Sequence, residues 1–138
     1  MKKYNSESYY GIVDNIETLE AKDDAASQIM GGDWRMPTET EIQELIDYTT
    51  NEWVEDFNGT GVNGYKFTSK TDTSKYIFIP AAGNRQGSSF HSQGSYGYVW
   101  SSSVVNSDAS TLYFGLDDFV PDSQDSRCYG LSVRGVFK

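Results

Sequence analysis

The helix-forming pattern of this sequence ends near Thr50, and this change restricts most of the chain to strands and loops. A first helix is predicted over residues 25–30, with Asp23 or Asp24 as its N-cap and Gly31-Gly32 as its stop. Its apolar positions recur at helical spacing. They are Ala25, Ala26, Ile29 and Met30.

A second helix is predicted to begin directly after Thr38. Thr38 and Glu41 stand three residues apart and form the pattern of a capping box. Ile42, Leu45 and Ile46 then make one apolar face, while the acidic residues face water or favour the positive end of the helix dipole.

Short strands are predicted after Thr50, separated by turn sequences. The first three cover residues 53–57, 64–69 and 75–83, with NGTGVNG and KTDTS between them. The run Tyr76–Ile79 is nearly continuous in apolar side chains, which predicts a strand buried on both faces.

The part of the chain from Gly83 to Arg127 reads as strands joined by long loops, which in a compact domain are usually functional or disordered. A last strand is expected over residues 127–137, with Tyr129, Leu131 and Val133 on one face. Alternation in the strand before it places Leu112 and Phe114 together on one face.

Trp100 is expected to be a core anchor, with Val99 on the opposite face. One set of residues is therefore expected to be exposed together: Tyr98, Val99, Val104, Val105 and Tyr113.

Length and charge narrow the classes of function. A chain of 138 residues is about one domain, here residues 1–138. The net charge of -9 would repel phosphate backbones and anionic membranes, so no nucleic-acid partner and no membrane insertion are expected. No secretory signal is recognised at the start of the chain.

Catalytic chemistry is poorly supported, so no enzyme activity, no cofactor and no metal are predicted. His91 is the one histidine and Cys128 the one cysteine, too few for an internal disulfide, a zinc site or a nucleophile with an oriented base. Asp117, Asp118 and two nearby aspartates offer oxygen ligands that suit calcium, but they form no EF-hand loop.

The segment Gly94–Phe114 consists mainly of Tyr, Ser, Gly and Val, and it lacks Lys, Arg and Glu. Tyr offers broad contact area with few torsions to freeze, and Ser and Gly adapt their hydrogen bonds, which is the chemistry of antibody-like contact surfaces. A ligand-binding face is predicted within residues 84–132. Its candidate residues are Ser89, Phe90, His91, Tyr96, Tyr98, Val99, Val104, Val105, Tyr113, Gly115, Asp117, Asp118, Phe119 and Cys128.

The order of several motifs resembles a known family. GGDWRMPTETEIQEL, GVNGYKFTSK, IFIPAAG, GYVWSSS, LYF and RCYGLSVRGV occur in sequence over residues 18–137. This series is similar to bacterial and phage C-type-lectin-fold domains of the Fibrobacter major-paralogous (DUF1566-like) kind, relatives of the formylglycine-generating-enzyme superfamily. The C-terminal half resembles the variable proteins of diversity-generating retroelements.

The resemblance implies an α+β fold with two helices packed on small antiparallel sheets and long ligand-face loops. It also implies a protein or glycan receptor on a cell surface as partner. The chain would lie on a phage virion or a bacterial surface as part of a larger assembly, and an oligomer is one form that this assembly can take. An alternative is a structural domain of a tail fibre or surface stalk, and a less favoured one is a formylglycine-generating-like enzyme.

The sequence departs from two related groups. It has WSSS where calcium-binding lectins have WND, and it lacks their EPN or QPD triplet, so calcium-dependent sugar binding is not expected. With Cys128 alone, it also lacks the cysteine pair that holds copper in formylglycine-generating enzymes.

Overall fold

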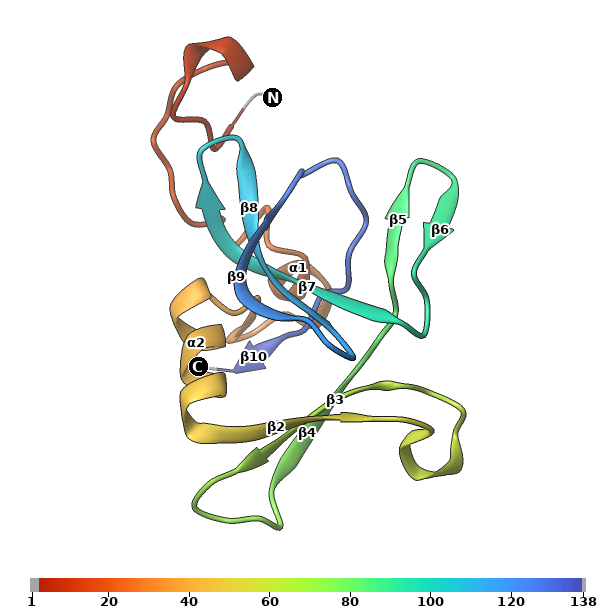
Figure 1. Cartoon of the computed structure of the whole chain (residues 1–138). Helices are drawn as coiled ribbons and strands as arrows, with labels where there is room; N and C mark the ends of the chain where they lie inside the picture. The colour runs from red at the N-terminus through yellow and green to blue at the C-terminus, as the bar shows by residue number, and fades with distance from the viewer. Residues whose placement is uncertain (1–2, 138) are drawn as a thin grey trace.

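The computed structural model describes residues 3–137 and shows a mixed α+β arrangement of two short helices and several small antiparallel sheets (Figure 1). The helical elements are η1 (Ser8–Tyr10), α1 (Ala25–Met30), α2 (Glu39–Tyr48) and η2 (Phe57–Gly59). The strands are β1 (Trp34–Arg35), β2 (Thr49–Val54), β3 (Gly64–Ser69), β4 (Tyr76–Pro80), β5 (Asn84–Gln86), β6 (Ser89–His91), β7 (Tyr96–Val105), β8 (Asp108–Gly115), β9 (Phe119–Asp125) and β10 (Val136–Phe137).

The strands form four antiparallel sheets among the described residues. Their orders are β1-β10, β2-β3-β4, β5-β6 and β7-β8-β9. Helix α2 lies beside the β7-β8-β9 sheet and runs directly into β2, while the β5-β6 hairpin stands apart on the other side of β7 (Figure 1).

Both predicted helices are present with their predicted caps. The Asp24 side chain accepts a hydrogen bond from the Ser27 N–H at 2.9 Å, and Gly31 ends α1 with a φ of 67°. In α2 the capping box between Thr38 and Glu41 is complete. Of the apolar positions that recur at helical spacing in α1, only Ala26 is buried, and the Ile29 side chain is 83 % exposed.

Three strand predictions need correction. Strand β2 begins at Thr49 and ends at Val54, because Asp56 adopts a left-handed conformation with φ of 49°. Strand β4 is not buried on both faces, since Tyr76 is 47 % exposed. It is also an edge strand, paired only with β3.

The third correction concerns the chain end, where only Val136–Phe137 pairs as a strand. The residues before β10 run as a loop along β7. The Ser132 N–H donates to the Tyr98 carbonyl at 3.2 Å, and the Ser132 carbonyl accepts from the Trp100 N–H at 3.0 Å. These bonds to β7 replace the continuous strand that alternation of Tyr129, Leu131 and Val133 predicted.

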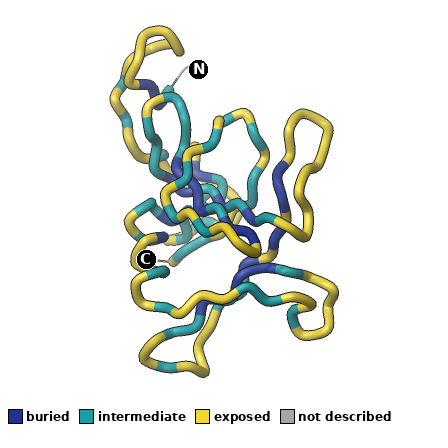
Figure 2. Tube along the Cα trace, viewed as in Figure 1, coloured by how far each residue is buried: buried dark blue, intermediate teal, exposed yellow. Residues whose placement is uncertain are grey.

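The core lies where α2, the β2-β3-β4 sheet and the β7-β8 pair meet, and its residues come from all three. Buried segments gather at this centre, whereas residues 6–13 and the tip of the β5-β6 hairpin are exposed (Figure 2). The core cluster contains Ile42, Tyr65, Phe67, Ile79, Ala81, Val99, Leu112 and Phe114.

The inward orientation of Leu112 and Phe114 is confirmed, but that of Trp100 is wrong. In the β7-β8 register, Val99 lies opposite Leu112 and therefore shares its inward face, whereas Trp100 lies opposite Thr111. Val99 is consequently only 3 % exposed and Trp100 is half-buried on the outer side.

Candidate recognition surface

Three tyrosines from two neighbouring strands meet on the outer face of the β7-β8 pair. Tyr96 and Tyr98 are two residues apart on β7, and Tyr113 lies opposite Tyr98 on β8. The Tyr96 and Tyr113 rings stack with centroids 5.5 Å apart, and the Tyr98 ring is 5.1 Å from that of Tyr113. We call these three residues the tyrosine cluster. All three side chains are half-buried, so part of each ring meets solvent.

Glycines on both faces of this strand pair make room for aromatic rings from the neighbouring strand. A Cβ atom at Gly115 would lie 2.6 Å from carbon atoms of the Tyr96 ring. Gly115 is therefore buried, and its contribution is to make room for Tyr96 rather than to present a side chain. On the inner face, Gly97 makes room for the Phe114 ring in the same way.

Two phenols of the cluster, those of Tyr98 and Tyr113, have raised pKa values. Burial, reinforced by the negative charge of nearby Asp118, raises the pKa of Tyr113 to about 12. Burial also raises the pKa of Tyr98. The Tyr113 hydroxyl donates to Asp118 Oδ2 at 3.5 Å. At neutral pH the cluster is therefore an uncharged surface that combines aromatic area with hydroxyl donors and acceptors.

The β5-β6 hairpin brings three predicted residues to the surface beside β7. Ser89, Phe90 and His91 are exposed on β6, and the Phe90 side chain is 62 % exposed. The Arg85 guanidinium lies 5.4 Å from the centre of the Phe90 ring. Backbone hydrogen bonds in both directions between Arg85 and Gly130, each 2.8 Å long, join this hairpin to the loop that carries Cys128.

The turn between β8 and β9 divides the predicted residues. Asp117 and Asp118 are exposed. Phe119 instead packs against the core, with its ring centroid 5.1 Å from that of Tyr65. Its assignment to the exposed face needs correction, because Phe119 pairs with Phe114 across β8 and β9 and shares its inward side.

The three valines predicted on the face do not join the tyrosine cluster. Val99 is in the core. Val104 and Val105 follow an irregularity in the β7-β8 register and line a separate hollow with N-terminal residues such as Tyr4. The prediction that these valines are exposed together with Tyr98 and Tyr113 is therefore wrong, because the strand changes register between Trp100 and Val104.

Cys128 is exposed in the loop after β9, with its Sγ 3.3 Å from the Ser126 hydroxyl. The sequence pattern missed one buried polar residue of the β5-β6 hairpin. Asn84, on β5, is buried, and its Oδ1 has no hydrogen-bond partner within residues 3–137. No local pattern singles out Asn84, because its burial depends on the position of the hairpin.

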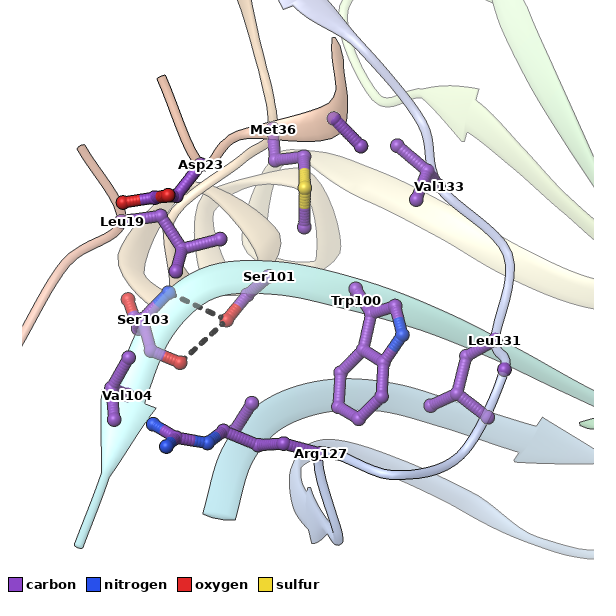
Figure 3. Close-up of a pocket in the computed structure, with 13 residues that line it drawn as sticks. Leu19, Asp23, Met36, Trp100, Ser101, Ser103, Val104, Arg127, Leu131 and Val133 are labelled. Atoms are coloured by element: carbon purple, nitrogen blue, oxygen red, sulfur yellow. Dashed lines mark hydrogen bonds between the residues drawn. The ribbon is translucent and has the colours of Figure 1, made fainter. Parts of the chain in front are cut away.

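The outer face of β7 continues into an apolar pocket of about 360 Å³ (Figure 3). Trp100, Met36 and Leu131 surround it, and Arg127 lies along one side (Figure 3). Arg127 donates to the backbone carbonyl groups of Tyr4, at 2.7 Å, and Lys3, at 3.1 Å. The pocket can hold an apolar group, but it presents no nucleophile beside a base.

Within residues 3–137, no three His, Cys, Asp or Glu side chains are grouped so that they could hold a metal ion. Neither described helix has the length and apolar character needed to span a bilayer. The comparisons with known proteins found no matching family model, no matching curated protein and no matching solved structure.

Proposed function

We propose that this chain is a binding domain that recognises a protein or glycan receptor on a cell surface through the tyrosine cluster. The supporting observation is the contact of the Tyr113 ring with those of Tyr96 and Tyr98 on a strand pair whose opposite face is the hydrophobic core. Because the core supports this strand pair, the rings are held in place before a ligand binds, which lowers the entropy cost of binding. The function is binding without catalysis.

The proposed ligand face is smaller than the sequence predicted. It comprises the tyrosine cluster, the exposed hairpin residues Ser89, Phe90 and His91, and the turn residues Asp117 and Asp118. Cys128 borders it through the loop that Arg85 and Gly130 join to the hairpin. We further propose that the scaffold is a C-type lectin fold carried on a phage virion or a bacterial surface, and that the face is diversifiable.

A cell-binding assay tests the role of the cluster. Fluorescent multimers of the wild-type chain and of the variant Tyr98→Ala/Tyr113→Ala are presented to a panel of bacterial strains. A matched control, Tyr9→Ala/Tyr48→Ala, removes two exposed tyrosines outside the cluster. We expect a loss of about 2 kcal/mol or more, at least about thirtyfold in affinity, for the cluster variant only. Equal binding by all three proteins would contradict the proposal.

The diversification proposal has a separate test in the neighbouring DNA. A reverse-transcriptase gene and a near-copy of the 3′ coding sequence that differs only at adenines are expected. If long flanking sequence contains neither, the face is not diversified by this route, and the binding proposal is unaffected.

A structural role in an assembly is the second candidate, and the N-terminal segment favours it. Tyr9 is 88 % exposed, and Ile12 and Val13 beside it are also exposed. Exposed apolar side chains close together often mark a contact between proteins. Light scattering of the purified chain discriminates the two functions, because a stable oligomer that covers the tyrosine cluster would favour assembly.

A further inference from the structure

A hollow of about 430 Å³ lies next to the tyrosine cluster, between the β2-β3 connection and the β8-β9 turn. Tyr96 forms part of its wall and also belongs to the cluster, so the hollow and the proposed ligand face are continuous. Trp53 supplies a second aromatic wall. Glu55, Asp117 and Asp118 line it as well.

Hydrogen bonds from Asn63 hold this hollow in shape. The Asn63 Nδ2 donates to the Gly94 carbonyl at 3.1 Å, and its Oδ1 accepts from the Asp56 N–H at 3.1 Å. The Asn63 carbonyl accepts from the Ala81 N–H at 2.8 Å. One side chain therefore joins the loop before β7 to the β2-β3 connection, and the two sides of the hollow are fixed relative to each other.

The charge of the hollow is negative and uncompensated. Glu55, Asp117 and Asp118 form no ion pair within residues 3–137, and no Lys or Arg of that range lines the hollow. Elsewhere in the chain, Lys and Arg side chains pair with other acids, such as Arg35 with Glu41. A cationic group that entered the hollow would thus meet carboxylates that no Lys or Arg of the described residues neutralises.

Trp53 carries an unmet hydrogen-bond donor in this wall. Its indole Nε1 is enclosed and has no hydrogen-bond partner within the described residues. Unpaired enclosed donors are uncommon in folded proteins and call for an explanation. Because Trp53 lines the hollow, a ligand that entered it would lie beside this indole.

We propose that the hollow receives an arginine residue of a protein receptor. A guanidinium group is planar, so it can stack on the Tyr96 ring while its N–H groups donate to Asp117 and Asp118. If the indole turns so that the enclosed Nε1 reaches the hollow, its N–H can donate to the peptide carbonyl of the same arginine. This inference rests on the proposed binding function and makes it specific, because it selects a protein with an exposed basic loop over a neutral glycan.

The test is an NMR titration of the ¹⁵N-labelled full chain with N-acetyl-arginine methylamide. N-acetyl-citrulline methylamide is the matched probe, because it has the same shape without the charge. We expect saturable shifts of the Ser95, Tyr96 and Asp117 amides and of the Trp53 indole N–H, with a Kd on the order of 10 mM for one side chain. The citrulline probe should bind about fivefold more weakly.

Two charge-neutralised variants complete the experiment. Asp117→Asn/Asp118→Asn should weaken arginine binding about fivefold, whereas Glu7→Gln/Glu44→Gln removes two exposed charges elsewhere and should leave it unchanged. The ¹⁵N spectra report whether each variant is folded. The inference is overturned if arginine gives no saturable shifts in the hollow, if citrulline binds equally well, or if both variants weaken arginine equally.

Failure of this inference is distinguishable from failure of the binding function. If the hollow variant binds cells like the wild type while Tyr98→Ala/Tyr113→Ala does not, the tyrosine cluster recognises the receptor without an arginine in the hollow. If the arginine probe binds but the tyrosine variant keeps cell binding, the cluster is not the receptor-binding surface.

Discussion

At the scale of single residues, Gly97 and Gly115 determine how aromatic side chains are distributed over the β7-β8 pair. Gly97 lies under the Phe114 ring in the core, and Gly115 lies under the Tyr96 ring on the outside. Gly97 pairs with Phe114 across the two strands, and Gly115 pairs with Tyr96. Each of these rings can therefore lie close to the backbone of the neighbouring strand. The tyrosine cluster depends on this arrangement as much as on the tyrosines.

Replacing Gly97 by Ala should therefore destabilise the fold. The new Cβ would lie 2.0 Å from Phe114 Cζ, and Phe114 is completely buried, so either the ring or the strand must move. We expect a loss of about 2 to 4 kcal/mol in the free energy of unfolding, measured by urea denaturation. The control Ser95→Ala, at an exposed position nearby, should change it by less than about 0.5 kcal/mol. Equal stabilities for the two variants would contradict the packing described here.

Glu41 should make the stability depend on pH. Its carboxylate accepts two hydrogen bonds from Arg35, at 2.5 and 2.6 Å, and this pairing is the main reason that its pKa is lowered to about 2. Its charged form therefore contributes stability above about pH 4.5, and that contribution is lost as the pH falls toward 2.

Glu41→Gln keeps a polar side chain for the capping box and removes the charge. We expect a loss of about 1 to 2 kcal/mol in the free energy of unfolding at pH 7, with the difference from the wild type shrinking between pH 4.5 and 2. Urea denaturation at several pH values measures it, with the exposed Glu44→Gln as control. A difference that stayed constant with pH would show that the Arg35 pairing does not stabilise the fold.

At the scale of elements, the three serines after Trp100 connect β7 to the start of α2. The Ser103 hydroxyl accepts a hydrogen bond from the Glu39 N–H at 3.1 Å, and the Ser102 N–H donates to the Pro37 carbonyl at 2.7 Å. The Ser101 hydroxyl accepts from the Ser103 N–H at 3.0 Å, within the irregular stretch of β7. The WSSS sequence thus has a structural role in this chain.

Ser103→Ala tests this connection, because it leaves the first N–H of α2 without its partner. We expect a loss of about 1 kcal/mol in the free energy of unfolding and faster amide hydrogen exchange in the first turn of α2. Ser107→Ala, in the turn after β7, should alter neither quantity. Unchanged exchange at Glu39 in Ser103→Ala would refute the connection.

Local signals predicted the elements better than their orientation. The caps at Asp24 and Thr38 define both helices, because the partners in each cap are only three residues apart. The alternation of side chains correctly placed Val99 and Trp100 on opposite faces of the strand, but it could not tell which of these faces meets the core. That choice depends on the register with β8, where Leu112 and Phe114 lie opposite Val99 and Gly97.

The candidate site was predictable in part for the same reason. The tyrosine-rich composition pointed to Tyr96, Tyr98 and Tyr113, which the structure brings together. Trp53 belongs to β2, and Glu55 and Asn63 belong to the β2-β3 connection. These residues are far from Tyr96 in sequence, and only the fold places them beside it. Contacts between such distant segments leave no periodic signal along the chain.

At the scale of the whole molecule, segments from both ends of the chain support the β7-β8-β9 sheet. Arg127 ties the loop after β9 to the backbone of Lys3 and Tyr4, and the Leu19 N–H donates to the Ser102 carbonyl at 2.9 Å. No disulfide can form within a chain that has one cysteine, so hydrogen bonds and the core hold these segments. The tyrosine cluster therefore lies on a sheet that segments from both ends of the chain support.

If the tyrosine cluster binds the receptor, ¹⁹F NMR of the chain labelled with 3-fluorotyrosine should detect the contact at these three rings. The chain has 10 tyrosines, and single Tyr→Phe variants assign their resonances. On addition of receptor solubilised from a strain that binds the chain, the signals of Tyr96, Tyr98 and Tyr113 should shift or broaden, while those of Tyr9, Tyr10 and Tyr48 should not. Changes confined to Tyr9 and Tyr10, with the cluster unaffected, would contradict the account.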